Sequence, residues 1–251
     1  MGTAFIAKNT NAENSGLRQF VPPVTRNLEA WHFLNTDAAK AATNYARGGK
    51  GDAQIRGTPV EFAEYIQFKG QANFLETQVA DAPTQTIFSV IRSRDTLVDL
   101  AHSPAFYGTY PDSAKGTLLY WNAGPATLVK TAARYTDEAH TIPSTFPIST
   151  PSASINIGEW SLIIDITNAD SNRCINATSG SDLKNDNPNF GRAFSNLPFR
   201  IGSGHPGSTQ FEGTADMALW AHYSVELTSS EIAAVVARIR AYFLLRYKIV
   251  L

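Results

Sequence analysis

Aromatic side chains beside amide, carboxylate or imidazole groups are the residues of this sequence best suited to chemistry, and that chemistry is sugar binding. A sugar ring needs an aromatic platform, together with amide, carboxylate or guanidinium groups for its hydroxyls. The candidate ligand contacts are Tyr107, Tyr110, Tyr120, Trp121, Asn122, Trp220 and His222. For Trp220, burial between two sheets is at least as good an interpretation, because such rings contribute most of the buried area of a sandwich.

Paired carboxylates would point to glycoside hydrolysis, in which two carboxyl groups face each other across the sugar bond. Alternate positions of one strand share a face and could supply such a pair. Glu61 with Glu64, and Asp165 with Asp170, have other spacings. The sequence therefore predicts no catalytic residues.

The residues that could bind a metal do not have the spacing of a known metal site. The five histidines include no pair two or four residues apart, so a zinc site is not indicated. Asp182 and Asp186 lie in an Asn- and Asp-rich segment whose oxygen atoms suit calcium, although the spacing is not that of an EF-hand. They are weak candidates for calcium, because such a segment is more often a turn. No other cofactor is predicted.

The composition of the chain argues against several classes of protein. The chain has 251 residues and a formal net charge of -1, which argues against a nucleic-acid partner. Cys174 is the single cysteine, so we expect a small buried residue and no intrachain disulfide. The N-terminus has no apolar region of signal-peptide length, and no run is long enough to span a membrane. We expect synthesis in the cytosol without a signal peptide, and no membrane insertion.

The elements that would position these residues are clearest near the C-terminus. Residues 215–223 alternate in polarity and predict a strand with one strongly buried face. Thr228 and Glu231 have the spacing of a capping box, which predicts a helix starting there. Apolar residues then recur at helical spacing, which leaves Arg238, Arg240 and Arg246 outside.

Further strands are predicted along the rest of the chain, with polar connections between them. They cover 27–33, 64–70, 73–75, 86–92, 118–122, 126–129, 158–167 and 199–202, with a helical turn near 37–45. The polar segment 168–190 predicts a surface excursion with one short strand near 173–175. The prediction is an all-β fold: a two-sheet antiparallel jelly-roll sandwich at 27–251, with a C-terminal helix and an extended N-terminal arm at 1–26.

Three motifs carry a resemblance to a known superfamily: Arg200-Ile-Gly202, Phe211-Glu-Gly213 and Leu227-Thr-Ser-Ser-Glu-Ile232. They resemble the C-terminal signature of the laminin-G-like branch of the concanavalin A-like lectin/glucanase superfamily. Landmarks similar to that family extend over residues 27 to 246. The resemblance implies a jelly roll, a fold that hosts lectins, hydrolases, lyases and structural modules. Many relatives carry a calcium ion at the rim, but the catalytic strands of the family's hydrolases and alginate lyases are not matched.

The leading functional hypothesis is a non-catalytic structural or carbohydrate-binding module of a larger assembly. The arm with Val21-Pro-Pro-Val24 and the tail 232–242 are similar to domains of phage virion proteins. That similarity implies a tail or surface component in the virion, partnered by host glycan or neighbouring virion subunits. It also implies a homo-oligomer formed through residues 1–26. The alternatives are a polysaccharide-degrading lyase or hydrolase on the same fold, and a purely structural decoration protein without a ligand.

Overall fold

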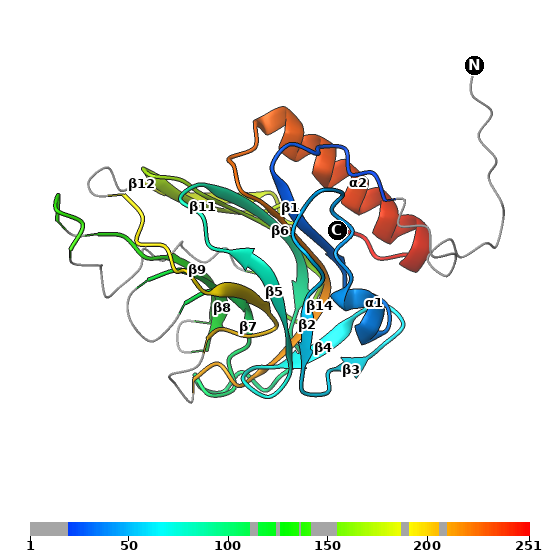
Figure 1. The fold of residues 1–251 in the computed structure, drawn as a ribbon. Helices are drawn as coiled ribbons and strands as arrows, with labels where there is room; N and C mark the ends of the chain where they lie inside the picture. Colours follow the sequence, from blue (N-terminus) through cyan, green and yellow to red (C-terminus); the bar gives the residue numbers. More distant parts are fainter. Residues whose placement is uncertain are drawn as a thin grey trace, which may run out of the picture.

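Two antiparallel β-sheets face each other, and a long helix covers the outer side of one of them (Figure 1). The computed structural model describes residues 20–110, 115–123, 126–135, 137–141, 155–186, 191–205 and 210–251. All pairings between the described strands are antiparallel. The predicted all-β sandwich with a C-terminal helix is confirmed.

The larger sheet, sheet A, has eight strands among the described residues. Seven follow one path: β12 (Ser181–Asp186), β11 (Ser171–Asn176), β10 (Ser161–Thr167), β6 (Gln85–Arg92), β14 (Thr214–Tyr223), β4 (Ile66–Lys69) and β3 (Val60–Glu61). The eighth strand, β1 (Leu28–Phe33), pairs with the second half of β14, beyond the part that pairs with β4. The ten-residue β14 thus holds β6 on one edge and both β4 and β1 on the other.

Sheet B has six strands among the described residues. Their order is β2 (Gln54–Arg56), β5 (Phe74–Ala80), β13 (Pro198–Ile201), β7 (Ala105–Gly108), β8 (Thr117–Asn122) and β9 (Thr127–Ala132). Two helices complete the described fold, the short α1 (Ala38–Ala42) and the long α2 (Ser229–Tyr247). The helical turn predicted near 37–45 corresponds to α1, which Asp37 caps.

The central strands of sheet A are buried on both faces, which makes the molecule three layers deep. Phe68, Ile87 and Phe199 pack in the core between the sheets. On the other side of sheet A, Val235, Ile239 and Phe243 of α2 pack in a second core with Phe88, Leu219 and Tyr223. Phe20 and Val24 belong to this second core, whereas residues 1–19 of the predicted arm lie outside the described residues.

A bulge in β14 decides which of its side chains face which core. The register between β14 and β6 shifts between Met217 and Leu219. Before the shift Ala215 and Met217 lie between the sheets, and after it Trp220 does. Leu219 and the odd positions after it face α2 instead. The extra residue of a bulge exchanges the two faces of a strand. The strand was predicted correctly, but the expectation of one strongly buried face was wrong, because both faces are covered.

The start of α2 is a capping box, as the sequence predicts. The Thr228 hydroxyl accepts a hydrogen bond from the Glu231 amide at 3.3 Å, and the Glu231 carboxylate accepts one from the Thr228 amide at 2.8 Å. Arg26, just before β1, donates two further hydrogen bonds to Glu231. Its guanidinium lowers the pKa of Glu231 to about 2. The beginning of the helix is therefore tied to the beginning of the domain.

The segment 168–190 differs from its prediction. It contains two strands, because β11 and β12 form a hairpin with Arg173 opposite Lys184 and Ile175 opposite Asp182. The polar residues of β12 suggested turns, yet half-buried and exposed positions alternate along it. Charged residues are common on an exposed edge strand, where they discourage pairing with another molecule.

Replacing Gly202 by alanine should destabilise the fold by about 3 kcal/mol. Gly202 has φ +83°, and a Cβ atom there would lie 2.2 Å from the Phe68 side chain in the core between the sheets. Gly48 is a matched control, because its φ is +79° and no atom lies within 4 Å of the added Cβ. Urea denaturation of both variants separates backbone strain from steric overlap. Equal losses of stability at the two positions would contradict the packing argument.

Candidate functional site

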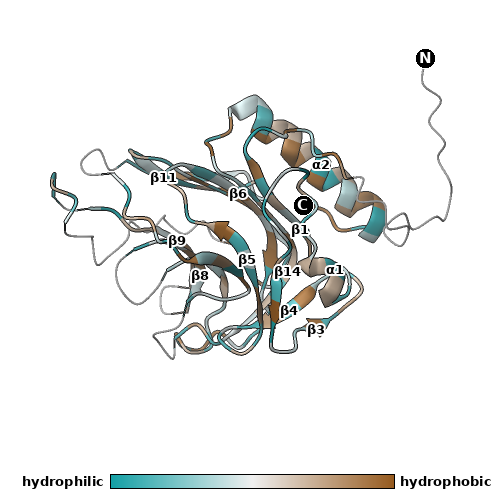
Figure 2. Ribbon diagram, viewed as in Figure 1, coloured by the Kyte–Doolittle hydropathy of each residue, from teal (hydrophilic) through white to brown (hydrophobic). Residues whose placement is uncertain are grey.

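The outer face of sheet B is open to solvent along β2, β5 and β13. Along β5, Leu75 and Val79 point into the core, whereas Glu76, Gln78 and Ala80 are half-buried or exposed. Figure 2 shows hydrophobic and hydrophilic segments along this strand. Opposite residues of antiparallel strands share a face, so Gln54 of β2 and Arg200 of β13 lie beside Glu76 on the outside.

An ion cluster stands at the centre of this open face. Arg56 donates a hydrogen bond to Glu76 at 2.9 Å, and Arg200 donates two to the other carboxylate oxygen at 3.1 and 3.2 Å. These hydrogen bonds, that of Arg56 foremost, hold the pKa of Glu76 below its usual value. The Arg200 guanidinium also lies 4.4 Å from the centre of the Phe74 ring. Two guanidinium groups on one carboxylate leave a net positive charge.

Aromatic residues lie farther along the same side of sheet B. Arg200 contacts the Gly204 carbonyl, and the next residue, His205, donates its backbone amide to the Tyr110 carbonyl at 3.3 Å. Tyr120 on β8 packs against Phe211, with ring centres 4.5 Å apart. Burial raises the pKa of Tyr120, and nearby Tyr110 raises it further. The open face of sheet B therefore combines fixed charges and an amide, Gln78, with partly exposed aromatic rings.

Three of the predicted ligand contacts lie at or near this face. Tyr110, Tyr120 and Asn122 are all half-buried. Alternation along β8 places Tyr120 and Asn122 outward and Trp121 inward. These three residues stay candidates for ligand contact.

The other four predicted contacts are buried, so the prediction is corrected for them. Tyr107, Trp220 and His222 are fully buried and Trp121 is 5% exposed. The bulge in β14 turns Trp220 and His222 toward the core between the sheets. There His222 lies 3.0 Å from the Gln85 side-chain oxygen. A sugar approaching from solvent does not reach these side chains.

The two calcium candidates are each engaged by a cation of the β11–β12 hairpin. Arg173 donates a hydrogen bond to Asp182 at 2.7 Å, which holds the pKa of Asp182 below its usual value. Lys184 pairs with Asp186 at 2.7 Å. Within the part of the chain that the structure describes, no group of three or more His, Cys, Asp or Glu residues could hold a metal ion. Calcium binding therefore stays a prediction from the sequence.

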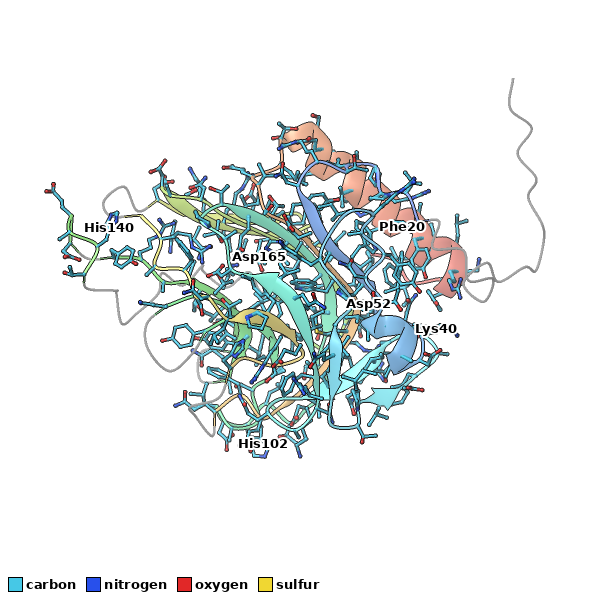
Figure 3. All side chains as sticks on the ribbon, in the orientation of Figure 1. Phe20, Lys40, Asp52, His102, His140 and Asp165 are labelled. Atoms are coloured by element: carbon cyan, nitrogen blue, oxygen red, sulfur yellow. The ribbon has the colours of Figure 1, made fainter. Side chains whose placement is uncertain are left out.

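Asp165 and Lys130 form a buried ionisable pair that the sequence did not reveal as such. The Asp165 carboxylate accepts a hydrogen bond from the Tyr107 hydroxyl and lies 3.9 Å from the Lys130 ammonium. Figure 3 shows Asp165 deep between the two sheets. Burial raises the pKa of Asp165 to about 8 and lowers the pKa of Lys130 to about 7. The sequence signal is a charged residue inside an apolar strand, as in Ile164-Asp165-Ile166.

A second buried ion pair joins Asp81 to Arg192. The two groups are 2.8 Å apart, and their side chains are 0% and 1% exposed. Asp81 also accepts from the Thr117 hydroxyl at 3.2 Å, and Arg192 donates to the Ala82 carbonyl at 2.5 Å. Neither buried pair is open to solvent, so both serve the fold rather than ligand capture.

A crevice of about 480 Å³ lies on another part of the surface. It is lined by Phe20, Val21, Asn44, Tyr45, Ala46, Arg47 and Gly48. The Asn44 side chain is used locally, because it bonds the backbone of Trp31, Ala46, Glu29 and Lys50. The crevice thus offers a ligand fewer polar groups than the open face of sheet B does. None of the described helices is long and apolar enough to cross a membrane.

Comparisons with known proteins show solved structures of similar fold but identify no family for this chain. No family model matches the chain, and no curated protein matches its sequence. A similar solved structure is the binding domain of Paraclostridial Mosquitocidal Protein 1, with 13% identity and a TM-score of 0.59 over 86% of this chain and 52% of that chain. Another is a Trypanosoma rangeli sialidase mutant displaying trans-sialidase activity, with 10% identity and a TM-score of 0.59 over 90% of this chain and 37% of that chain.

A third is the binding domain of Botulinum Neurotoxin DC in complex with SialylT. It shares 10% identity and a TM-score of 0.58 over 85% of this chain and 52% of that chain. This chain spans about half or less of the length of these neighbours. At such identities the likeness concerns the fold alone, which is the two-sheet β-sandwich that the sequence predicts.

Proposed function

We propose that this domain is a non-catalytic module that binds a glycan on the open face of sheet B. The observation that carries the proposal is the cluster of Arg56, Glu76 and Arg200, with the Phe74 ring against Arg200 and with Tyr120 farther along the same face of the sheet. Guanidinium and carboxylate groups are suited to sugar hydroxyls, and an aromatic ring is suited to the apolar face of a sugar. Two structures with a similar fold hold such ligands, which supports the proposal: the neurotoxin binding domain is in complex with SialylT, and a second Trypanosoma rangeli sialidase structure is in complex with sialic acid.

The ion cluster is already ordered by its own hydrogen bonds. Glu76 fixes both guanidinium groups, so a ligand would not have to immobilise these long side chains. Arg56 is the more exposed of the two arginines, and Gln78 is exposed on the same strand face as Glu76. These two side chains are therefore the best placed to meet a sugar from solvent.

We expect the purified domain to bind members of a broad glycan array, and Arg56→Ala and Gln78→Ala each to weaken that binding at least tenfold, about 1.4 kcal/mol. Titration calorimetry with the best array ligand measures the change. Arg47→Ala, in the separate crevice, is the control and should bind as the parent does. Silence across the array would refute the proposal. Loss of binding in Arg47→Ala alone would move the site to the crevice, and new reducing ends or unsaturated products would indicate an enzyme.

The same proposal includes a larger assembly: a phage tail or surface structure in which the module contacts host glycan and neighbouring subunits. The polar arm that enters through Val21-Pro-Pro-Val24 supports an oligomer formed through residues 1–26. Light scattering of the full chain, compared with a chain lacking residues 1–19, tests the role of the arm. Calcium is proposed only at Asp182 and Asp186, and Asp182→Asn should weaken calcium binding in calorimetry; a parent chain that binds no calcium would refute this site.

A further inference from the structure

We propose that the outer face of α2 is an interface for a second copy of this chain, packed as an antiparallel helix pair. The inner face of α2 packs in the second core, where Val235, Ile239 and Phe243 are buried. The opposite face is exposed among the described residues, and α2 lies along the outside of the molecule (Figure 1). Its composition is that of a buried surface.

Residues advance about 100° per position around a helix, which groups a set of exposed side chains on the side opposite Ile239. The set is Ala233, Ala234, Ala237, Ala241, Leu244 and Leu245. Leu244 is 50% exposed and Leu245 is 75% exposed. Among the described residues of α2, no charged residue lies in this arc, and Arg238 and Arg240 only flank it. A helix that is apolar on opposite sides is normally buried on both.

Residue size along this arc favours a second copy as the occupant. Its N-terminal end carries Ala233 and Ala234, its centre Ala237 and Ala241, and its C-terminal end Leu244 and Leu245. In an antiparallel pair with a two-fold axis near position 239, each leucine pair meets the alanine pair of the other helix. Large side chains then lie against small ones, and Ala237 meets Ala241, which lets the helices approach to about 8 Å. Such a contact is isologous, the usual geometry of a dimer.

Charge at the two ends of α2 selects the antiparallel direction. Exposed Glu226 precedes the helix and exposed Lys248 follows it, whereas Glu231 in the first turn is already paired with Arg26 and Arg246 lies on the inner side of the helix. An antiparallel pair places the basic end of each helix beside the acidic end of the other. The two helix dipoles also favour the antiparallel arrangement. A parallel pair would bring like ends together. Arg240 is held by the Ala177 carbonyl, and Arg238 flanks the axis as an exposed, flexible side chain.

The test is the oligomeric state of the full chain. Sedimentation equilibrium over a range of concentrations should show a monomer–dimer equilibrium, and Leu245→Glu should weaken it at least tenfold. Val98→Glu is the matched control, because Val98 is an apolar residue that is 71% exposed elsewhere on the surface. This control should dimerise as the parent does. Since both positions are exposed, neither variant should lose its fold, which circular dichroism verifies.

Cysteine cross-linking tests the direction of the pair. An oxidised mixture of Ala237→Cys and Ala241→Cys chains should form mixed dimers in preference to dimers of either variant alone. The native Cys174 is buried and adds little background. A chain that is monomeric at all concentrations, or a dimer unaffected by Leu245→Glu, would overturn the proposal. A dimer that appears only after residues 1–19 are removed would also overturn it, because the arm would then be the occupant of this face.

Discussion

Replacing Asp81 by alanine should lower the free energy of unfolding by about 3–5 kcal/mol, because it leaves the Arg192 guanidinium buried without its counter-ion. Arg192 is 1% exposed, and its remaining partners are the Thr117 hydroxyl and the Ala82 carbonyl. Asp81 also accepts hydrogen bonds from Thr117 and from the Ser195 amide. The substitution therefore leaves several buried polar groups without a hydrogen-bond partner at once. Urea denaturation followed by tryptophan fluorescence measures the loss.

The double variant Asp81→Ala, Arg192→Met separates the burial of a lone charge from the loss of the pair. Removing both charges should cost less than removing Asp81 alone, because no unpaired guanidinium remains. Asp186→Ala breaks an exposed pair with Lys184 and should change the stability by less than about 1 kcal/mol. A double variant that is less stable than the single one would show that the pair acts through packing rather than charge.

Asp165→Asn should become more stable relative to the parent as pH rises from 5 to 9, by on the order of 3–5 kcal/mol in total. Burial raises the pKa of Asp165 to about 8, above its unfolded value of about 4. The folded form therefore holds a proton that the unfolded form has released. The stability from this proton is fully present below about pH 4 and is lost as pH rises through 8. Asparagine carries no charge at any of these pH values and escapes that loss.

Other buried groups titrate in or near the same range, so the difference between variant and parent is the quantity to measure. Burial lowers the pKa of His32 to about 4 and that of His222 to about 3, and both effects raise stability as pH rises toward 6.5. Burial lowers the pKa of Lys130 to about 7, which raises stability between pH 7 and about 10. The contributions of the two histidines are common to both proteins and cancel in the difference, whereas Lys130, 3.9 Å from Asp165, is coupled to the substituted group and remains part of the difference. A difference that stays flat from pH 5 to 9 would mean that Lys130 keeps the carboxylate ionised throughout.

The sequence was most informative where local and long-range signals agree. The Thr228–Glu231 capping box and the helical spacing after it depend on neighbouring residues, and α2 starts as they predict. The alternation of 215–223 located β14 but not its bulge, because a bulge is set by the pairing with β6, a distant strand. That single shift reverses the faces of Trp220 and His222. Both faces of β14 are covered, so these two side chains are buried by packing against distant elements, which the local alternation does not reveal.

The candidate site was harder to find in the sequence for a related reason. Arg56, Glu76 and Arg200 belong to three strands far apart in the chain, and only the register of β2, β5 and β13 brings them together. Nothing near any one of them marks it as part of a cluster. Tyr120 and Asn122 were identified because they flank a tryptophan, although the tryptophan points inward and they point outward. Neighbours in sequence were therefore found more easily than neighbours across the sheet.

The position of β14 in the chain has a consequence for synthesis. It is the last strand of the domain, yet it lies inside sheet A between β6 and the two strands β4 and β1. β6 ends at Arg92, whereas β14 begins only at Thr214. The apolar faces of β6 and β10 therefore stay uncovered until the ribosome has synthesised β14 and α2. Contacts between such distant segments form slowly, and unpaired apolar strands are prone to aggregate. The larger sheet therefore cannot be completed before residue 223 has emerged from the ribosome.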